Sequence, residues 1–222
     1  MPYSLSDLEH FPADVVVHCG DKTWNLHGAV LATRCEWFRA ALLGGFQEGQ
    51  ARTIRIEEFE EKWISFLIEY IYLGGTPEPP YQEGQDLSYF ATCMTIFDLA
   101  DYFLLPELRR QMGARFANDM YLWGCGWHDA WKQQQQTRMD TLFELVRDLY
   151  TRDLNSPASK EFRPPVLNHL RGVQTGGEIP TTALIDLIDE FPALGADLFK
   201  ASLGRAEALL HAEEDFDAEE EM

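Results

Sequence analysis

The sequence predicts an α+β fold, in which a small sheet packs against helices and is followed by a region that is entirely helical. Three stretches of strand type lie near the start of the chain, at 14–19, 22–26 and 52–56. Beyond them, apolar residues recur at helical spacing as far as residue 203. Strands and helices in separate runs, rather than in regular alternation, are typical of α+β proteins.

The first two strands are expected to form a hairpin. Residues 14–19 contain three consecutive valines, and residues 20–21 (Gly-Asp) are a two-residue turn of the kind that joins tightly paired strands. In residues 22–26 polar and apolar side chains alternate, so Trp24 and Leu26 share one face. The hairpin therefore presents an apolar face that helices can cover.

Helices fill most of the remaining chain. Two short ones are predicted at 27–32 and 35–43, and a glycine pair ends the second. The helix over 63–73 has the clearest pattern, because its apolar residues follow the spacing of one buried face. Those residues are Trp63, Phe66, Leu67, Tyr70 and Ile71. Further helices are predicted at 87–104, 106–116 and 142–150, as a short helix at 163–170, and around 184–188 and 194–203, with a linker at 172–180.

A series of residue blocks occurs in the order Asp14–Val17, His27–Ala32, Phe38–Leu42, Phe46–Glu48, Ile54–Ile56, Tyr70–Gly74 and Leu99–Leu108. Together these blocks resemble the BTB/POZ domain, a family of protein-interaction modules. The resemblance covers about 14–116 and implies a BTB/POZ fold with a three-stranded sheet flanked by helices, no enzymatic activity and no cofactor. The helical part from 142 to 203 resembles the C-terminal region of many filamentous-fungal BTB proteins.

Most of these residues are expected to serve the fold rather than a ligand. His27 is expected at the junction of hairpin and helix, where it satisfies backbone groups, and Asp14 is expected to anchor the first strand. Tyr70 and Tyr72 are expected to pack in or beside the core. The residues taken as the fold signature are Asp14, His27, Leu31, Phe38, Tyr70 and Tyr72.

One block points to a partner. Family members that recruit cullin-3 carry an apolar residue, any residue and a glutamate in the loop before the third strand, and Phe46-Gln47-Glu48 fits this pattern. An exposed aromatic would fill a hydrophobic slot on the partner, and the carboxylate would fix the register. The resemblance thus implies a cullin-3 ubiquitin-ligase adaptor, with Phe46 folded back on the domain as the alternative.

Two departures from the family pattern bear on other functions. The family commonly has Lys or Arg directly after the histidine, where this chain has Gly28. In transcriptional members that cation pairs with the aspartate matching Asp14 in a pocket used for co-repressors, so its loss counts against such a role. Only thirteen residues precede Asp14, which weakens the case for a helix-swapped homodimer. A dimerising scaffold or a transcription-linked protein with no ubiquitin role is the alternative function.

The expected organisation has five parts. Residues 1–13 lead into a BTB/POZ domain over 14–120, and 121–137 form a connector rich in tryptophan and glutamine. An α-helical extension covers 138–211, and an acidic tail expected to be disordered covers 212–222. The connector holds three tryptophans that either pack the extension onto the domain or form a peptide-binding surface. They are Trp123, Trp127 and Trp131.

Charge and composition exclude some partners. The formal net charge is −19, and seven of the last eleven residues are acidic. A chain this acidic repels the phosphates of nucleic acids and anionic membranes. The chain shows no secretory leader and no apolar run long enough to span a membrane, so a reduced location in the cytoplasm, the nucleus or both is expected.

Catalytic and metal motifs are weak. No G-x-S-x-G or G-x-G-x-x-G occurs, and Gln50 stands where a phosphate-binding loop needs lysine. Asp98 and Asp101 lie one helical turn apart, which indicates a solvated helix face. Cys125 and His128 provide only two of the four ligands that a structural zinc requires. Neither an enzyme nor a metal site is therefore expected.

Overall fold

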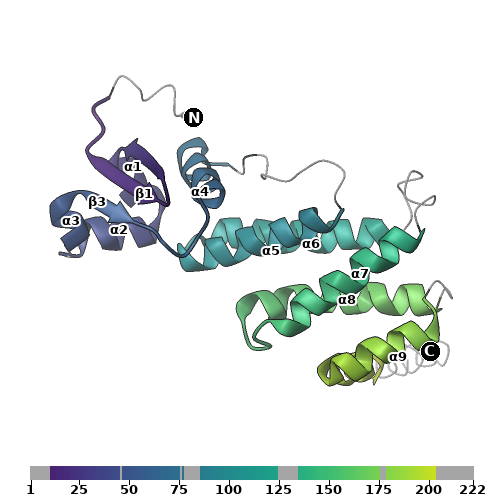
Figure 1. Ribbon diagram of the computed structural model, residues 1–222. Helices are drawn as coiled ribbons and strands as arrows, with labels where there is room; N and C mark the ends of the chain where they lie inside the picture. Colours follow the sequence, from purple (N-terminus) through teal and green to yellow (C-terminus); the bar gives the residue numbers. More distant parts are fainter. Residues whose placement is uncertain are drawn as a thin grey trace, which may run out of the picture. The chain divides into compact units, whose positions relative to one another are not determined.

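The computed structural model describes residues 11–45, 47–75, 77, 86–124, 135–175 and 179–203 (Figure 1). The chain divides into two compact units, Met1–Ala114 and Arg115–Met222. The first contains a three-stranded sheet with helices, and the described part of the second is helical. Within the described ranges, no helix is both long and apolar enough to cross a membrane.

The sheet of the first unit has the strand order β2-β1-β3. The central strand β1 (Val15–Cys19) pairs antiparallel with β2 (Lys22–Leu26) and parallel with β3 (Thr53–Arg55). Cys19 lies opposite Lys22, which leaves Gly20 and Asp21 as the turn. Gly20 has φ of 54°, a conformation that glycine adopts without steric cost. The predicted hairpin is therefore confirmed.

Helices gather around the sheet (Figure 1). Helix α1 (Gly28–Arg34) leads directly into α2 (Glu36–Leu43), as the two short predicted segments indicated. The side chains at the centre of the first unit are fully buried, because they come from the sheet and from several helices at once. They include Val17, Leu31, Phe38, Ile64, Leu67 and Phe103. The remaining helices that begin in this unit are α3 (Gln47–Ala51), α4 (Glu61–Leu73), α5 (Asp86–Tyr102) and α6 (Pro106–Gly124).

The second unit is built from α7 (Gln135–Thr151), α8 (Pro157–Thr175), α9 (Thr181–Glu190) and a last helical segment at 192–203. Its start is the C-terminal part of α6, where the ring of Phe116 lies 4.5 Å from that of Phe162 on α8. One face of each helix is buried, as the spacing of apolar residues predicted. Buried residues on these faces include Leu142, Leu145, Leu149, Val166, Leu170, Leu184, Leu187 and Leu194.

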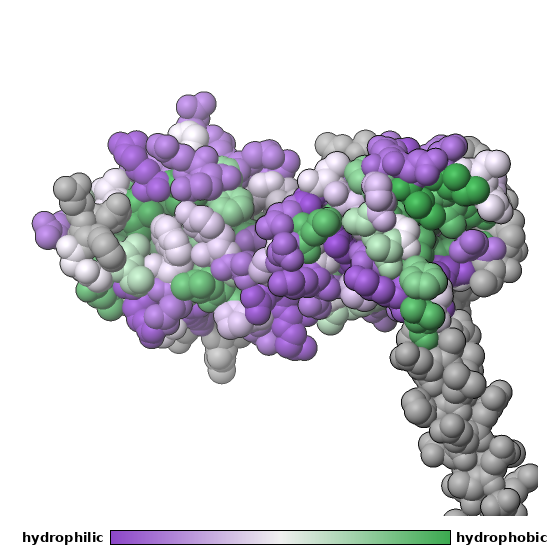
Figure 2. Space-filling model, turned by 90° about the horizontal axis from the view of Figure 1, so that it is seen from below, coloured by the Kyte–Doolittle hydropathy of each residue, from purple (hydrophilic) through white to green (hydrophobic). Residues whose placement is uncertain are grey.

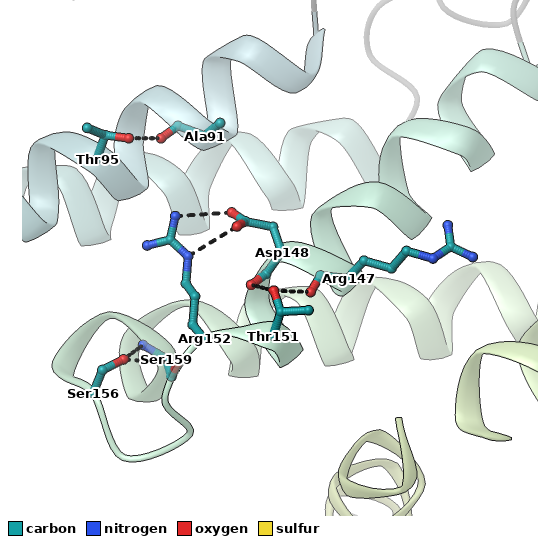
Figure 3. Close-up of polar contacts among 8 residues, drawn as sticks. All are labelled: Ala91, Thr95, Arg147, Asp148, Thr151, Arg152, Ser156 and Ser159. Carbon is teal, nitrogen blue, oxygen red and sulfur yellow. Dashed lines mark hydrogen bonds and ion pairs between the residues drawn. The ribbon is translucent and has the colours of Figure 1, made fainter. Parts of the chain in front are cut away.

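Helix α8 is much longer than the short helix predicted at 163–170, and the linker predicted from residue 172 was wrong at its start. The helix begins at Pro157, and the Ser156 hydroxyl caps it by accepting a hydrogen bond from the Ser159 amide at 3.1 Å (Figure 3). Pro164 and Pro165 lie inside it. The carbonyls they leave without a donor belong to residues 160 and 161, which are exposed to water. Burial of Phe162 on Phe116 further favours the longer helix.

Arginine–carboxylate pairs lie on the surface of the second unit. Arg152 bonds Asp148 one turn earlier on α7, with a shortest distance of 3.2 Å (Figure 3). Arg147 lies 3.1 Å from Glu190 and so joins α7 to α9. Both members of the Arg147–Glu190 pair are about half exposed, where such a pair contributes little stability.

Candidate partner-binding site

Asp14 connects the start of the sheet to the start of α1. Its Oδ1 accepts a hydrogen bond from the Gly28 amide at 2.7 Å, which satisfies one of the free N–H groups of the first helical turn. Its other carboxylate oxygen lies 3.6 Å from Nη1 of Arg52, which precedes β3. The aspartate therefore holds the N-terminus of α1 and pairs with a cation at the same time.

Arg52 supplies the cation that is missing at position 28. A Cβ atom on Gly28 would lie 2.9 Å from the Val15 side chain and 3.2 Å from Arg52 Nη1. Glycine at this position thus leaves the space in which Arg52 reaches Asp14. Arg52 itself has φ of 53°, an uncommon conformation for a residue other than glycine. No sequence pattern indicated this pairing, because the two residues are far apart in the chain.

This ion pair borders a pocket of about 580 Å³ in the first unit. Arg39 of α2 also lines it, while its guanidinium pairs with Glu36. Leu43 lies at its edge and is 70% exposed. The pocket thus combines apolar walls with two arginines and one aspartate. The wall residues are Gly28, Ala29, Ala32, Thr33, Leu42 and Leu43.

His27 and Tyr72 form a consistent chain of donors and acceptors. The His27 amide donates to the Tyr72 hydroxyl at 2.9 Å, and that hydroxyl lies 3.0 Å from Nδ1 of the same histidine. Nε2 lies 3.1 Å from the carbonyl of Phe11. A neutral ring with its proton on Nε2 satisfies all three contacts. Burial raises the pKa of the Tyr72 phenol, which keeps it a hydrogen-bond donor.

Arg34 is a structural residue that the sequence patterns did not single out. Its Nη1 donates to the carbonyls of Ile71 and Tyr72, both at 2.8 Å, at the C-terminal end of α4. The last turn of α4 contains no basic residue of its own. Arg34 therefore satisfies carbonyls that lack helical partners, and it opposes the negative end of the helix dipole. Gly74 ends the helix with φ of 67°.

The segment proposed for cullin-3 lies partly in a helix. Gln47 and Glu48 belong to α3, so the expectation that they lie in a loop was wrong, while Phe46 falls outside the described residues. Gly49 allows α3 to lie close against the end of α2, because a Cβ there would lie 2.6 Å from the Leu42 carbonyl oxygen. The exposed Leu43 is three positions before Phe46.

A second apolar surface lies where α5 ends. The ring of Tyr102 packs 5.2 Å from that of Phe59 and 6.1 Å from that of Trp37, yet the residue is 39% exposed. Leu104 is 52% exposed and has φ of 55°. Burial and then the carboxylate of Glu58 raise the pKa of Tyr102. The sequence placed these residues in a family block but did not show that they are exposed.

The other fold-signature side chains lie in or beside the core. Leu31 and Phe38 are fully buried, and Tyr70 is partly buried. Burial also raises the pKa of the Cys35 thiol, which donates to the Phe103 carbonyl at 3.2 Å and so acts as a packed core residue.

Some candidate residues lie where the structure gives no side chain. Trp123 is in α6, but only its backbone is described, and Trp127, Trp131, Cys125 and His128 fall outside the described residues. Among the side chains that are described, no group of three or more His, Cys, Asp or Glu residues is placed to hold a metal ion. The peptide-binding role of the tryptophans stays a prediction.

Comparison with known proteins agrees with the resemblance. The family model for the BTB/POZ domain matches residues 4–119, which is more than half of the chain. The chain belongs to the BTB/POZ domain family. The predicted α+β class with a BTB fold is confirmed, and BTB/POZ domains are modules of protein–protein interaction.

The relatives with curated descriptions are much longer proteins. BTB/POZ domain-containing protein 9 of Bos taurus is 31% identical over 122 residues, and that of Homo sapiens is 30% identical over 122 residues. Each match covers 43% of this chain and 20% of the relative, so the chain spans about a fifth of their length.

Two solved BTB domains are also similar to the chain. The BTB domain of human gigaxonin has a TM-score of 0.38 and 18% identity, covering 49% of this chain and 80% of that one. The BTB domain of zebrafish PATZ1 has a TM-score of 0.34 and 19% identity, covering 45% and 71%.

Proposed function

We propose that this BTB/POZ protein acts by binding rather than by catalysis, as a substrate adaptor for a cullin-3 ubiquitin ligase in the cytoplasm or nucleus. Phe46 and Glu48 would contact the cullin, and the helical second unit or the acidic tail would hold the substrate. Two observations support the proposal. The residues Phe46-Gln47-Glu48 match the apolar-x-Glu pattern in a domain of a protein-interaction family, and Leu43, three positions before Phe46, is exposed.

The test is calorimetric titration of the purified chain with the N-terminal domain of cullin-3 from the same organism. We expect binding with a micromolar Kd or tighter and its loss in Phe46→Asp, because a charge replaces the aromatic anchor. Phe11→Asp is the matched control, since Phe11 is 62% exposed and lies before β1. Equal binding by Phe46→Asp and the control, or no binding by the unaltered chain, would refute the proposal.

A transcription-linked role is the second candidate, and one observation favours it. Arg52 gives Asp14 a cationic partner despite Gly28, beside a pocket of about 580 Å³. A reporter assay with the chain tethered to a promoter would test this role. We expect repression that Arg52→Glu abolishes and Arg55→Glu, an exposed arginine on β3, leaves intact. Unchanged expression of the reporter in the presence of the unaltered chain would exclude it.

A further inference from the structure

The last helical segment of the second unit, 192–203, is attached to α7 and α8 by polar contacts. The Tyr150 hydroxyl donates to Oδ2 of Asp197 at 2.9 Å, and Nη1 of Arg163 lies 3.6 Å from the same oxygen. The Arg163 guanidinium also lies 4.4 Å from the centre of the Tyr150 ring. We call these three side chains the Tyr150 cluster. They join the segment to α7 through the tyrosine and to α8 through the arginine.

The Arg163 guanidinium is only partly satisfied in this arrangement. Only 12% of its side chain is exposed. Its Nε and Nη2 atoms are buried, and neither has a hydrogen-bond acceptor among the described residues. A buried donor without an acceptor costs free energy, because it has given up its hydrogen bonds to water. If the segment moves away, water reaches these N–H groups and removes that cost.

Apolar packing of the segment stops early. Leu194 is the last buried residue among those described, and every residue of 195–203 is at least partly exposed. Phe199 is 65% exposed and Leu203 is 49% exposed. Figure 2 shows hydrophobic residues at several places on the surface, so exposed apolar side chains are ordinary in this molecule. Side chains that are already exposed lose little burial when a segment opens, which is typical of regions of low local stability.

Gly195 lies between the packed and the polar part of the segment. A Cβ atom there would lie 2.9 Å from the Ile188 side chain, so glycine permits the close approach to α9. Glycine inside a helix also stabilises it less than other residues do, because it loses more backbone freedom on folding. The helix is therefore weakest directly after Leu194, where its apolar packing ends.

We propose that residues 195–203 form a latch, which opens and closes as one unit while α7, α8 and α9 stay folded. Gly195 is its hinge. The Tyr150 cluster closes it, together with the hydrogen bond that Nη1 of Arg171 donates to the Ala201 carbonyl at 2.9 Å. Opening uncovers the guanidinium of the cluster. In a chain of net charge −19, the latch thus controls access to a cation that is otherwise buried.

The experiment is hydrogen–deuterium exchange of the full chain, followed for individual amides by NMR. We expect the amides of 197–203 to share one opening free energy, lower than that of the buried turns of α7 and α8. Asp197→Ala should raise their exchange rates by one common factor of at least about ten, equal to about 1.4 kcal/mol, because the buried Arg163 charge loses its partner. Tyr150→Phe, which keeps the ring, should raise the same rates.

Asp189→Ala is the matched control, because Asp189 is an exposed aspartate of α9 outside the cluster. Its exchange rates should match those of the unaltered chain. Circular dichroism checks that each variant is folded, and Tyr150→Phe decides the question if Asp197→Ala does not fold. Exchange that slows step by step from Leu203 towards Asp197 would indicate fraying of a helix end and would overturn the proposal. So would amides of 197–203 that are as protected as those of α7 and α8, or rates that the cluster variants leave equal to the control.

Discussion

The two units differ in what their polar side chains bind. Among the described residues of the first unit, the side chains that connect distant elements mostly contact backbone atoms. Those described in the second unit mostly contact other side chains, as in Arg147 with Glu190 and Tyr150 with Asp197. Backbone-directed contacts of the first unit come from Asp14, His27, Arg34 and Cys35.

This difference bears on the sequence signature of the first unit, since the family model matches residues 4–119. A substitution by any residue other than proline leaves the backbone N–H and carbonyl in place, so a side chain that satisfies one of them is restricted in type and position. Two side chains that pair with each other can both be replaced by another matching pair of residue types. Such pairs therefore leave no fixed pattern in the sequence. Each unit contains an exception. Arg171 of the second unit bonds a backbone group, the Ala201 carbonyl, and Arg109 of the first unit pairs with a side chain, that of Asp101.

The largest loss of stability should come from a substitution in the apolar core of the first unit. The backbone-directed contacts of that unit depend on this core. Phe38→Ala removes a side chain that is fully buried, and we expect it to lower the free energy of unfolding by about 3–5 kcal/mol. Urea denaturation measures the loss. Leu43→Ala on the same helix is the control, because Leu43 is exposed and its truncation should cost less than about 0.5 kcal/mol. Equal effects of the two substitutions would contradict the packing described for α2.

The next effect tests a side-chain pair of the second unit. Tyr150→Phe removes a hydrogen bond to a carboxylate and should cost about 1.5–3 kcal/mol. Burial, with Asp197 beside it, raises the pKa of Tyr150 above its ordinary value. The stabilisation is therefore complete below the unfolded-state pKa of about 10 and is lost as the pH rises above it. Denaturation at pH 9 and at pH 11, about one pH unit to either side of that value, should show a smaller loss of stability in Tyr150→Phe than in the unaltered chain.

A smaller effect tests a backbone-directed contact. Asp14→Ala leaves the Gly28 amide without its acceptor and should cost about 1 kcal/mol, as the loss of a helix cap does. Asp14→Asn keeps an oxygen acceptor and should recover most of that stability, although it removes the charge that faces Arg52. Chemical denaturation distinguishes the two variants. If Asn were as damaging as Ala, the ion pair with Arg52 rather than the amide contact would hold α1.

The smallest effect is expected for a surface ion pair of the first unit. Like the pairs of the second unit, it joins two side chains. Arg110 and Gln111 donate to Glu107 and lower its pKa to about 2. Arg110→Ala should raise the pKa of Glu107 towards its ordinary value of about 4.3, with no measurable change in stability. Titration followed by NMR measures the pKa. A pKa that stays near 2 would assign the shift to Gln111 instead.

Prediction succeeded where the signal was local. The valine run with its Gly-Asp turn gave the hairpin, and the spacing of apolar residues gave the buried face of α4. It was wrong for α8, which was predicted only at 163–170, whereas packing of Phe162 and capping by Ser156 extend the helix over Pro157–Thr175. It also placed Glu48 in a loop although α3 contains it.

By itself, the sequence determined the α+β class, the family and the positions of most helices, because hydrophobic periodicity, turns and signature residues are properties of neighbouring positions in the chain. Only the tertiary structure decided that Arg52 replaces the cation missing at position 28, that Arg34 binds the end of α4, and that Phe199 faces outward while Asp197 faces inward. Each of these depends on segments that are distant in sequence and meet only after folding, so no local pattern records them.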